Sequence, residues 1–351
     1  PLYARFPALR SLPRAELATL PSPVQRVRLP DGTELWVKRD DLDAPDHGGN
    51  KVRALEFLLG AVRPGDTVLT LGGRGSTHVL ATAAHARRLG ARTTALRWPH
   101  ECSPTALAVA REAERLCDRV VPTWSAVGAI VRVAVARFAD AVASGRRARG
   151  GARRHVIPVG GSEPLGVLGH VNAALELAAQ IAAGELPMPR RVVLPLGSAG
   201  TTAGLALGFA AAGLDVEVVG VRVVPRITGS RRRVLRLADA TARLIEGVSR
   251  STNERANGPG GDSAPTVVPR VRPEHVRVEH AFYGGAYGRE LPAGAQATAL
   301  LHDATAGGAL PPLTLDPTYG AKAAAAAIAL AAHESGPTLF WATFDGRWME
   351  R

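Results

Sequence analysis

Short apolar runs alternate along this chain with longer stretches in which apolar residues recur every three or four positions. The runs predict strands, and the stretches predict amphipathic helices. We expect strands at 67–71, 93–98, 119–121, 155–159, 191–196, 216–223 and 338–341. We expect helices at 52–59, 78–89, 103–116, 125–143, 164–183, 233–245 and 321–333. Because strands and helices take turns, the pattern predicts an α/β fold with mostly parallel sheets and helices on their faces.

Two segments interrupt this alternation. Residues 145–154 are rich in glycine and arginine and are predicted to link two halves of the chain. Residues 250–265 are rich in serine, glycine, asparagine and proline and are predicted to form an exposed loop. At 351 residues the chain exceeds a typical single domain, so we expect two domains that share one cleft.

Composition argues against several classes of protein. The longest apolar run, 323–332, is shorter than the roughly 20 residues that cross a bilayer, and no secretory signal is recognised at the N-terminus. Two cysteines, Cys102 and Cys117, are too few for a disulfide framework or a zinc cluster, so no metal site is expected. We therefore predict a cytoplasmic protein without a membrane partner.

The net charge of +12 raises the question of nucleic-acid binding. The arginines are scattered apart from clusters at 146–154 and 231–233, and few aromatic residues accompany them for base stacking. No motif of a known nucleic-acid-binding module is present. The sequence therefore predicts a solvated basic surface and no nucleic-acid partner.

Only three of the 43 basic residues are lysines: Lys38, Lys51 and Lys322. A lysine amine can lose its proton near neutral pH and form a Schiff base, which a guanidinium cannot do. Lys51 follows two glycines and Asn50 and precedes a predicted helix, so its side chain is expected to enter a cleft from a fixed stem. The alternative is that Lys51 is an ordinary solvated lysine.

Two glycine-rich loops join strands to helices. The second loop consists of Gly197, Ser198, Ala199, Gly200, Thr201 and Thr202. Their backbone N–H groups, with the positive end of the following helix, suit a monophosphate, although an ordinary tight turn fits the same residues. The first loop, 72–77, offers Ser76 and Thr77 at the start of a helix, where Ser76 can equally be a helix cap. Both loops are expected at the carboxyl ends of strands, where ligands bind in α/β sheets.

These motifs together resemble the D-cysteine desulfhydrase and 1-aminocyclopropane-1-carboxylate (ACC) deaminase family. The matching segments are Val-Lys-Arg-Asp-Asp-Leu at 37–42, Gly-Gly-Asn-Lys at 48–51, Ile-Pro-Val-Gly-Gly-Ser at 157–162, the loop at 197–201, and Leu-Asp-Pro at 315–317 with Tyr319 and Lys322. The family implies a fold type II pyridoxal-phosphate (PLP) enzyme related to the tryptophan synthase β subunit. It implies a large PLP-binding domain of residues 1–52 and 160–351, a small domain of residues 53–159, and an active site in the cleft between them.

The resemblance also implies roles for individual residues. Lys51 would hold the cofactor as a Schiff base, and Lys51, Ser76, Tyr287 and Tyr319 would be catalytic. The cofactor-binding residues would be Lys51, Asn50, Thr77, Gly197, Ser198, Ala199, Gly200, Thr201 and Gly320. The substrate, a small amino acid, would contact Ser76, Thr77, His78 and Gly161. Lys38 and Lys322 are expected to form structural ion pairs, and a homodimer is expected because dimers are usual among relatives.

Three positions depart from the family pattern. Thr77 stands where the family has asparagine, Gly320 stands where it has threonine or glutamate opposite the pyridine nitrogen, and a His-Thr-Gly-Gly segment becomes Ala-Thr-Phe-Asp at 342–345. Without a carboxylate at the ring nitrogen we expect a neutral ring, which favours β-elimination. The first prediction is therefore α,β-elimination from D-cysteine or a relative, giving pyruvate and ammonia. The alternatives are a cyclopropane amino acid deaminase, another specialised PLP reaction, and a PLP-binding homologue with little catalysis.

Overall fold

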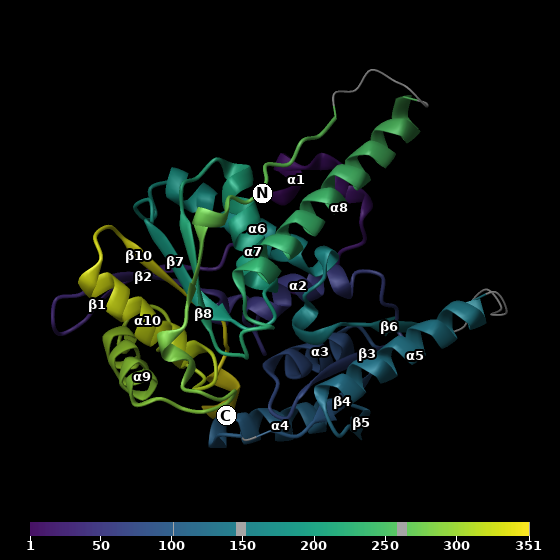
Figure 1. Ribbon diagram of the computed structural model, residues 1–351, viewed down its shortest axis with the longest axis horizontal. Coiled ribbons are helices and arrows are strands. Elements are labelled where there is room, and N and C mark those ends of the chain that lie inside the picture. The colour runs from purple at the N-terminus through teal and green to yellow at the C-terminus, as the bar shows by residue number, and fades with distance from the viewer. Residues whose placement is uncertain (101, 145–151, 258–264, 351) are drawn as a thin grey trace.

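A computed structural model describes residues 1–100, 102–144, 152–257 and 265–350 as two sheets with helices packed around them (Figure 1). The larger sheet has the strand order β1-β2-β10-β7-β8-β9. Its strands are β1 (Val24–Arg28), β2 (Glu34–Arg39), β7 (Arg191–Leu196), β8 (Glu217–Arg222), β9 (Val276–Glu279) and β10 (Thr338–Ala342). Only the edge pair β1 and β2 is antiparallel, and the remaining pairs are parallel.

Both faces of the larger sheet are covered. Successive side chains along β7 point to opposite faces, so Val192, Leu194 and Leu196 enter one core while Val193 enters another. The first core lies under α6 (Pro164–Ala182), α7 (Gly200–Ala212) and α8 (Arg231–Asn257). The second core lies under α9 (Pro292–Thr305) and α10 (Gly320–His333). This two-sided burial explains why β7 is apolar without alternation, as is typical of strands inside parallel sheets.

The smaller sheet is entirely parallel, with the order β5-β4-β3-β6. Its strands are β3 (Thr67–Gly73), β4 (Arg92–Trp98), β5 (Arg119–Pro122) and β6 (Arg154–Val156). Leu69, Leu71 and Leu96 face α5 (Ala126–Ser144), and Ala95 faces α3 (Thr77–Arg88) and α4 (Pro104–Leu116). Figure 1 shows this sheet with α3, α4 and α5 at the lower right of the molecule.

The helix α2 (Asn50–Leu58) joins the two halves. Its residues Leu55 and Leu58 pack with Val68 of β3 and Ala81 of α3, while its other side lies against α6. The remaining short elements are α1 (Leu2–Arg5) and six 3₁₀ turns, Pro7–Ser11, Asp40–Leu42, Val159–Gly161, Pro273–His275, Ala281–Tyr283 and Arg347–Glu350. Because α2 touches both halves, its first turn lies where the two sheets meet.

The α/β class predicted from the sequence is confirmed, and every predicted strand and helix is present; apart from the C-terminal end of α8, the ends are shifted by a few residues. The exposed loop predicted at 250–265 is wrong for its first half, because α8 continues to Asn257. Ser249 and Thr252 accommodate the helix by donating their hydroxyls to the carbonyls of Ile245 and Val248. Residues 258–264, and residues 145–151 of the predicted linker, lie outside the described part of the chain.

Several elements had no sequence prediction: α1, β1, β2, β9 and α9. The search for uninterrupted apolar runs also missed α6, which by length and composition alone could cross a membrane. Its most apolar window is 72% buried inside the fold, against α2 and α7. That burial gives α6 the character of a core helix.

Candidate functional site

Lys51 lies in the first turn of α2, directly after a backbone turn that only glycine adopts easily. Gly49 has φ +114°, and a Cβ atom there would lie 2.4 Å from the carbonyl oxygen of Thr343. Carboxylates hold the same turn: Asp43 accepts the N–H of Gly49 at 2.9 Å, and Asp345 accepts the N–H of Gly48 at 3.0 Å. The altered C-terminal segment of this chain therefore packs on the turn that presents Lys51.

The amine of Lys51 has an unusual environment. Burial lowers the pKa of Lys51 from 10.5 to about 8. Among the described residues, no carboxylate pairs with the Lys51 ammonium. Burial, followed by the charge of Lys51, also lowers the pKa of His78 to about 3 and the pKa of His170 well below its ordinary value. An unpaired amine whose charge is felt by two neutral imidazoles is suited to act as a nucleophile or a base.

The second glycine loop lies next to this turn. Asn50 donates its side-chain amide to the Thr201 hydroxyl at 2.7 Å, which ties the first turn of α2 to the first turn of α7. Ser198 accepts the hydroxyl of Ser162 at 2.7 Å, and Ala199 has φ +76°, a left-handed conformation that is strained for alanine. The buried hydroxyl of Thr202 has no partner among the described residues. These hydroxyls and the free N–H groups of the α7 N-terminus form a cradle for an anion.

The first glycine loop contributes Ser76, Thr77 and His78. Ser76 caps α3 by accepting the N–H of Val79 at 3.4 Å, so the capping role considered for it is present. His78 lies within 3.3 Å of the Thr70 hydroxyl, and its ring edge would be 3.6 Å from a Cβ atom placed on Gly161. His78 and Gly161, which are 83 positions apart, therefore lie side by side. Thr77 is the first residue of α3.

Tyr287 and Tyr319 are brought together. Their hydroxyls are hydrogen-bonded, and their ring centroids are 6.0 Å apart in an edge-on arrangement. Burial raises the pKa of Tyr287 to about 12 and the pKa of Tyr319 well above its ordinary value. A Cβ atom on Gly197 would lie 3.7 Å from the Tyr319 ring, so the tyrosine pair lies beside the anion cradle. His100, which sequence reasoning missed, packs edge-on against Tyr287 at 4.8 Å.

The other two lysines differ from Lys51. Lys38 forms the predicted ion pair, with its ammonium 2.7 Å from Glu176. The ion pair predicted for Lys322 is wrong, because its ammonium donates to the carbonyl of Tyr283 at 2.9 Å and no described carboxylate lies within ion-pair distance. Burial lowers the pKa of Lys322, and the nearby charge of Asp316 partly opposes that effect.

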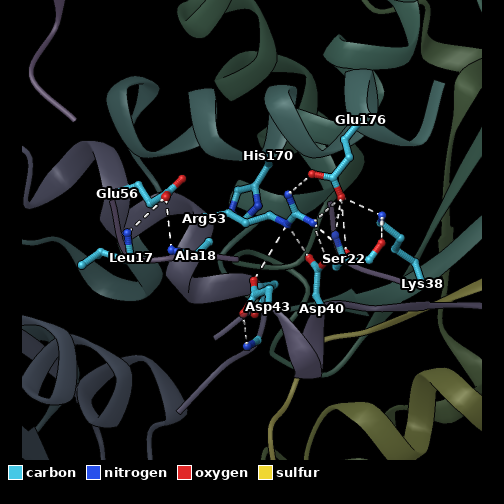
Figure 2. A network of polar contacts seen from close by, with 12 residues as sticks. Leu17, Ala18, Ser22, Lys38, Asp40, Asp43, Arg53, Glu56, His170 and Glu176 are labelled. Atoms are coloured by element: carbon cyan, nitrogen blue, oxygen red, sulfur yellow. Dashed lines mark hydrogen bonds and ion pairs between the residues drawn. The ribbon is translucent and has the colours of Figure 1, made fainter. Parts of the chain in front are cut away.

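A buried charge network lies under α2, two residues beyond Lys51. Arg53 donates to Asp40 at 2.6 Å and to Glu176 at 3.0 Å, and Glu176 also binds Lys38 (Figure 2). Asp40 accepts a further hydrogen bond from the Ser22 hydroxyl. Lys38 lies in β2, Asp40 in the 3₁₀ turn that follows it, Arg53 in α2 and Glu176 in α6, so the network fixes the helix that carries Lys51 against the larger sheet. Sequence reasoning predicted the ion pair of Lys38 and missed the rest of this network.

The candidate site lies at the carboxyl ends of the strands. The first turn of α2 packs on Thr343, directly after β10, while the cradle follows β7 and the first glycine loop follows β3. A hollow of about 700 Å³ lies elsewhere, beside Arg191 and Glu217 at the amino ends of β7 and β8. Ligands of α/β sheets bind beyond the carboxyl ends of the strands. Position therefore favours the Lys51 region over this hollow.

Comparison with known proteins agrees with this geometry. A family model described as "Pyridoxal-phosphate dependent enzyme" matches residues 15–340. The chain belongs to this family. The cofactor predicted from the sequence, pyridoxal phosphate, is thereby confirmed, as is the relationship to D-cysteine desulfhydrase and ACC deaminase.

Individual relatives of this pyridoxal-phosphate enzyme cover nearly its whole length. It is 38% identical to the nocardicin C-9' epimerase of Nocardia uniformis subsp. tsuyamanensis, over 96% of this chain and 94% of the relative. It is 34% identical to the D-cysteine desulfhydrase of Salmonella choleraesuis strain SC-B67, over 95% of this chain and 94% of the relative. A solved ACC deaminase homologue superimposes with a TM-score of 0.74 at 26% identity, over 97% of this chain and 94% of that one. These matches confirm the fold type II architecture.

The residues around Lys51 fit this cofactor. The unpaired amine suits the Schiff base, and the cradle with the unpartnered Thr202 hydroxyl suits the phosphate. When bound, pyridoxal phosphate supplies an electron sink for bond cleavage at the substrate α-carbon. The predicted roles of the individual site residues, and the domain boundaries at 52/53 and 159/160, remain predictions.

Gly320 provides a test of the position that the family resemblance assigns to the pyridine nitrogen. A Cβ atom there would lie 3.1 Å from Oδ2 of Asp316, which accepts the Gly320 N–H, and burial already raises the pKa of Asp316. We expect Gly320→Glu to destabilise the fold by about 1–3 kcal/mol, because it adds crowding and a second carboxylate beside Asp316. Gly320→Ala is the control for crowding alone. Denaturant unfolding and the cofactor spectrum measure the effects; equal stability of the two variants and an unchanged spectrum would remove any role for a carboxylate here.

Proposed function

We propose that this enzyme catalyses α,β-elimination from D-cysteine or a related small amino acid, giving pyruvate and ammonia. The observation that carries the proposal is the buried, unpaired Lys51 amine, joined through Asn50 and Thr201 to an anion cradle. The 34% identity to D-cysteine desulfhydrase over most of both chains supports this substrate class. Gly320 adds no carboxylate at the ring nitrogen, which is consistent with elimination.

The side chains divide the work by chemistry. Lys51 would hold the cofactor, and its amine would take the proton from the substrate α-carbon. Ser76, Thr77 and the N-terminus of α3 bind the substrate carboxylate, with His78 and Gly161 behind them. The Tyr287–Tyr319 pair keeps its protons at neutral pH, so it is able to give one to the departing sulfur. Loss of hydrogen sulfide leaves 2-aminoacrylate, which water converts to pyruvate and ammonia.

The proposal includes the setting of the enzyme. We place the active site between the large domain, 1–52 and 160–351, and the small domain, 53–159, because residues of both sheets gather there. We also place the protein in the cytoplasm as a homodimer that acts on a small amino acid, without nucleic-acid or membrane partners. Size-exclusion chromatography with light scattering measures the oligomeric state.

A substrate screen tests the reaction. Purified enzyme loaded with pyridoxal phosphate is incubated with D- and L-amino acids, including D-cysteine, β-chloro-D-alanine and a cyclopropane amino acid, and keto acid is measured. Pyruvate from D-cysteine is the expected result. Ketobutyrate from the cyclopropane substrate would instead indicate the deaminase, and no product from any substrate would favour a cofactor-binding homologue with little catalysis.

A second candidate is inversion of configuration at the substrate α-carbon. Inversion by a two-base route uses a proton-transfer group on each face of the α-carbon, and the buried tyrosine pair beside the cradle supplies a second group besides Lys51. The 38% identity to nocardicin C-9' epimerase favours the same reaction. Incubation in D₂O separates the two: epimerisation incorporates deuterium at the α-carbon and yields the opposite configuration without keto acid, whereas elimination yields pyruvate.

The depressed pKa of Lys51 predicts a pH dependence. Only the neutral amine captures the cofactor aldehyde, so the capture rate of the apo-protein should rise with pH and level off above about pH 8. Stopped-flow absorbance measures this rate. Nα-acetyl-lysine, which keeps a free ε-amine, is the control for any pH dependence of the aldehyde itself. A rate that continues to climb towards pH 10.5 would mean that Lys51 has the ordinary pKa of a lysine.

A further inference from the structure

His170 is a buried histidine that the proposed chemistry does not use. It lies on α6 with 2% of its surface exposed. Opposite it on α7 is Gly204, where a Cβ atom would lie only 2.3 Å from the Cβ atom of His170. Glycine at 204 thus allows α6 and α7 to approach closely, and the imidazole lies against the first turn of α7, under the anion cradle.

The two ring nitrogens of His170 have different surroundings. Nε2 lies 3.4 Å from the Thr201 hydroxyl oxygen, which already accepts the Asn50 amide at 2.7 Å. Nδ1 is buried and has no hydrogen-bond partner among the described residues. Figure 2 shows the ring beside Arg53. Burial, then the charges of Lys51 and Arg53, lower the pKa of His170 well below its ordinary value, so the ring is neutral.

A neutral imidazole carries one proton, and the structure favours its position. A proton on Nδ1 would be a buried donor without an acceptor, which folded proteins rarely contain. A proton on Nε2 is donated to Thr201. Thr201 then accepts two hydrogen bonds, from Asn50 and His170, and its own proton remains available to a third group above the loop.

We propose that His170 is a positioning residue, which through its Nε2–H group holds the Thr201 hydroxyl as a hydrogen-bond donor to the cofactor phosphate. The inference rests on the proposed use of this loop for pyridoxal phosphate. With His170 as donor, Thr201 meets the phosphate dianion with its proton outward and makes a charge-assisted hydrogen bond. Without that donor, the Thr201 proton is free to turn away from the phosphate.

Binding of two forms of the cofactor tests this role without relying on turnover. Apo-protein is titrated with pyridoxal phosphate and, separately, with pyridoxal, which has the aldehyde and lacks the phosphate. The variants are His170→Phe, His170→Gln, Thr201→Val and the double variant His170→Phe/Thr201→Val. Phenylalanine keeps the ring and removes the donor, and glutamine keeps a donor amide. Circular dichroism of each apo-protein checks that the fold is intact.

We expect His170→Phe to weaken pyridoxal phosphate binding by about tenfold and to leave pyridoxal binding unchanged. Thr201→Val should cause a similar loss, and the double variant should bind no more weakly than Thr201→Val alone. His170→Gln should bind pyridoxal phosphate within about threefold of the wild type. If His170→Phe does not fold, a wild-type-like result for His170→Gln and a phosphate-specific loss for Thr201→Val support the role.

The opposite results overturn it. Equal weakening of both ligands by His170→Phe would show a packing role, and multiplied losses in the double variant would show that His170 acts independently of Thr201. A His170→Gln variant that binds pyridoxal phosphate as weakly as Thr201→Val would also refute it. If the wild-type protein captures neither ligand, the proposed function fails and the inference fails with it. If the wild-type protein captures both ligands normally but the variants weaken pyridoxal phosphate and pyridoxal equally, only the His170 role is refuted.

Discussion

Replacing Lys51 with alanine is expected to abolish the absorption of the bound cofactor at about 420 nm and to lower turnover by at least about 10³-fold. Lys51 is the lysine at this site whose amine is unpaired and carries a depressed pKa. Lys38 is held by Glu176 and Lys322 donates to the Tyr283 carbonyl, so neither is free to replace it. Absorbance spectra of the purified proteins and keto-acid assays measure the two effects.

Lys51→Arg is the matched control. Arginine keeps a cation at the first turn of α2 but cannot form a Schiff base or accept a proton near neutral pH. It should therefore lose the absorption band as completely as alanine. Equal far-ultraviolet circular dichroism in all three proteins would attribute the loss to chemistry. A 420-nm band that persists in both variants would refute Lys51 as the anchor.

Replacing Arg53 with methionine is expected to reduce the free energy of unfolding by about 3–5 kcal/mol. The side chain of Arg53 is fully buried, and its guanidinium binds Asp40 at 2.6 Å and Glu176 at 3.0 Å. Removal of this cation leaves two buried carboxylates: Glu176 keeps its hydrogen bond from Lys38, whereas Asp40 keeps only those from the neutral Ser22 hydroxyl and Trp341 indole. Denaturant unfolding monitored by circular dichroism measures the change.

An exposed ion pair of the same chemistry is the control. Arg26 binds Glu34 at 2.7 Å with more than half of the arginine side chain in solvent, so Arg26→Met should change stability by less than about 1 kcal/mol. Adding Asp40→Asn to Arg53→Met should restore part of the loss, because the buried carboxylate that remains, Glu176, keeps its ion pair with Lys38. Equal effects of Arg53→Met and Arg26→Met would mean that the network does not stabilise α2.

Local sequence was sufficient for some features and insufficient for others. The strands and helices around the two glycine loops were predicted because their apolar periodicity is a property of neighbouring residues. The predicted end of α8 was wrong because a segment rich in serine and asparagine has the composition of a loop. In the structure, Ser249 and Thr252 instead hydrogen-bond within the helix. The ion pair of Lys322 was also wrong, since the choice between a carboxylate and the Tyr283 carbonyl depends on packing.

The partners of the site residues lie far away in the chain. Arg53 meets Glu176 across 123 positions, Asn50 meets Thr201 across 151, and Asp345 holds the turn before Lys51 across 297. Residue patterns within a short window carry no information about such pairs. His100 and His170 had no motif of their own, and they became visible only through their contacts with Tyr287 and Thr201.

The sequence by itself determined the α/β class, the family and its cofactor, because short motifs and apolar periodicity are local properties of the chain. It also predicted Lys51, among three lysines, as the anchor. The tertiary structure decided which groups surround that lysine: two neutral histidines, a tyrosine pair, and a buried arginine network under its helix. The physical reason is burial. The pKa of the Lys51 amine falls to about 8 only when folding removes water from segments that the sequence keeps far apart.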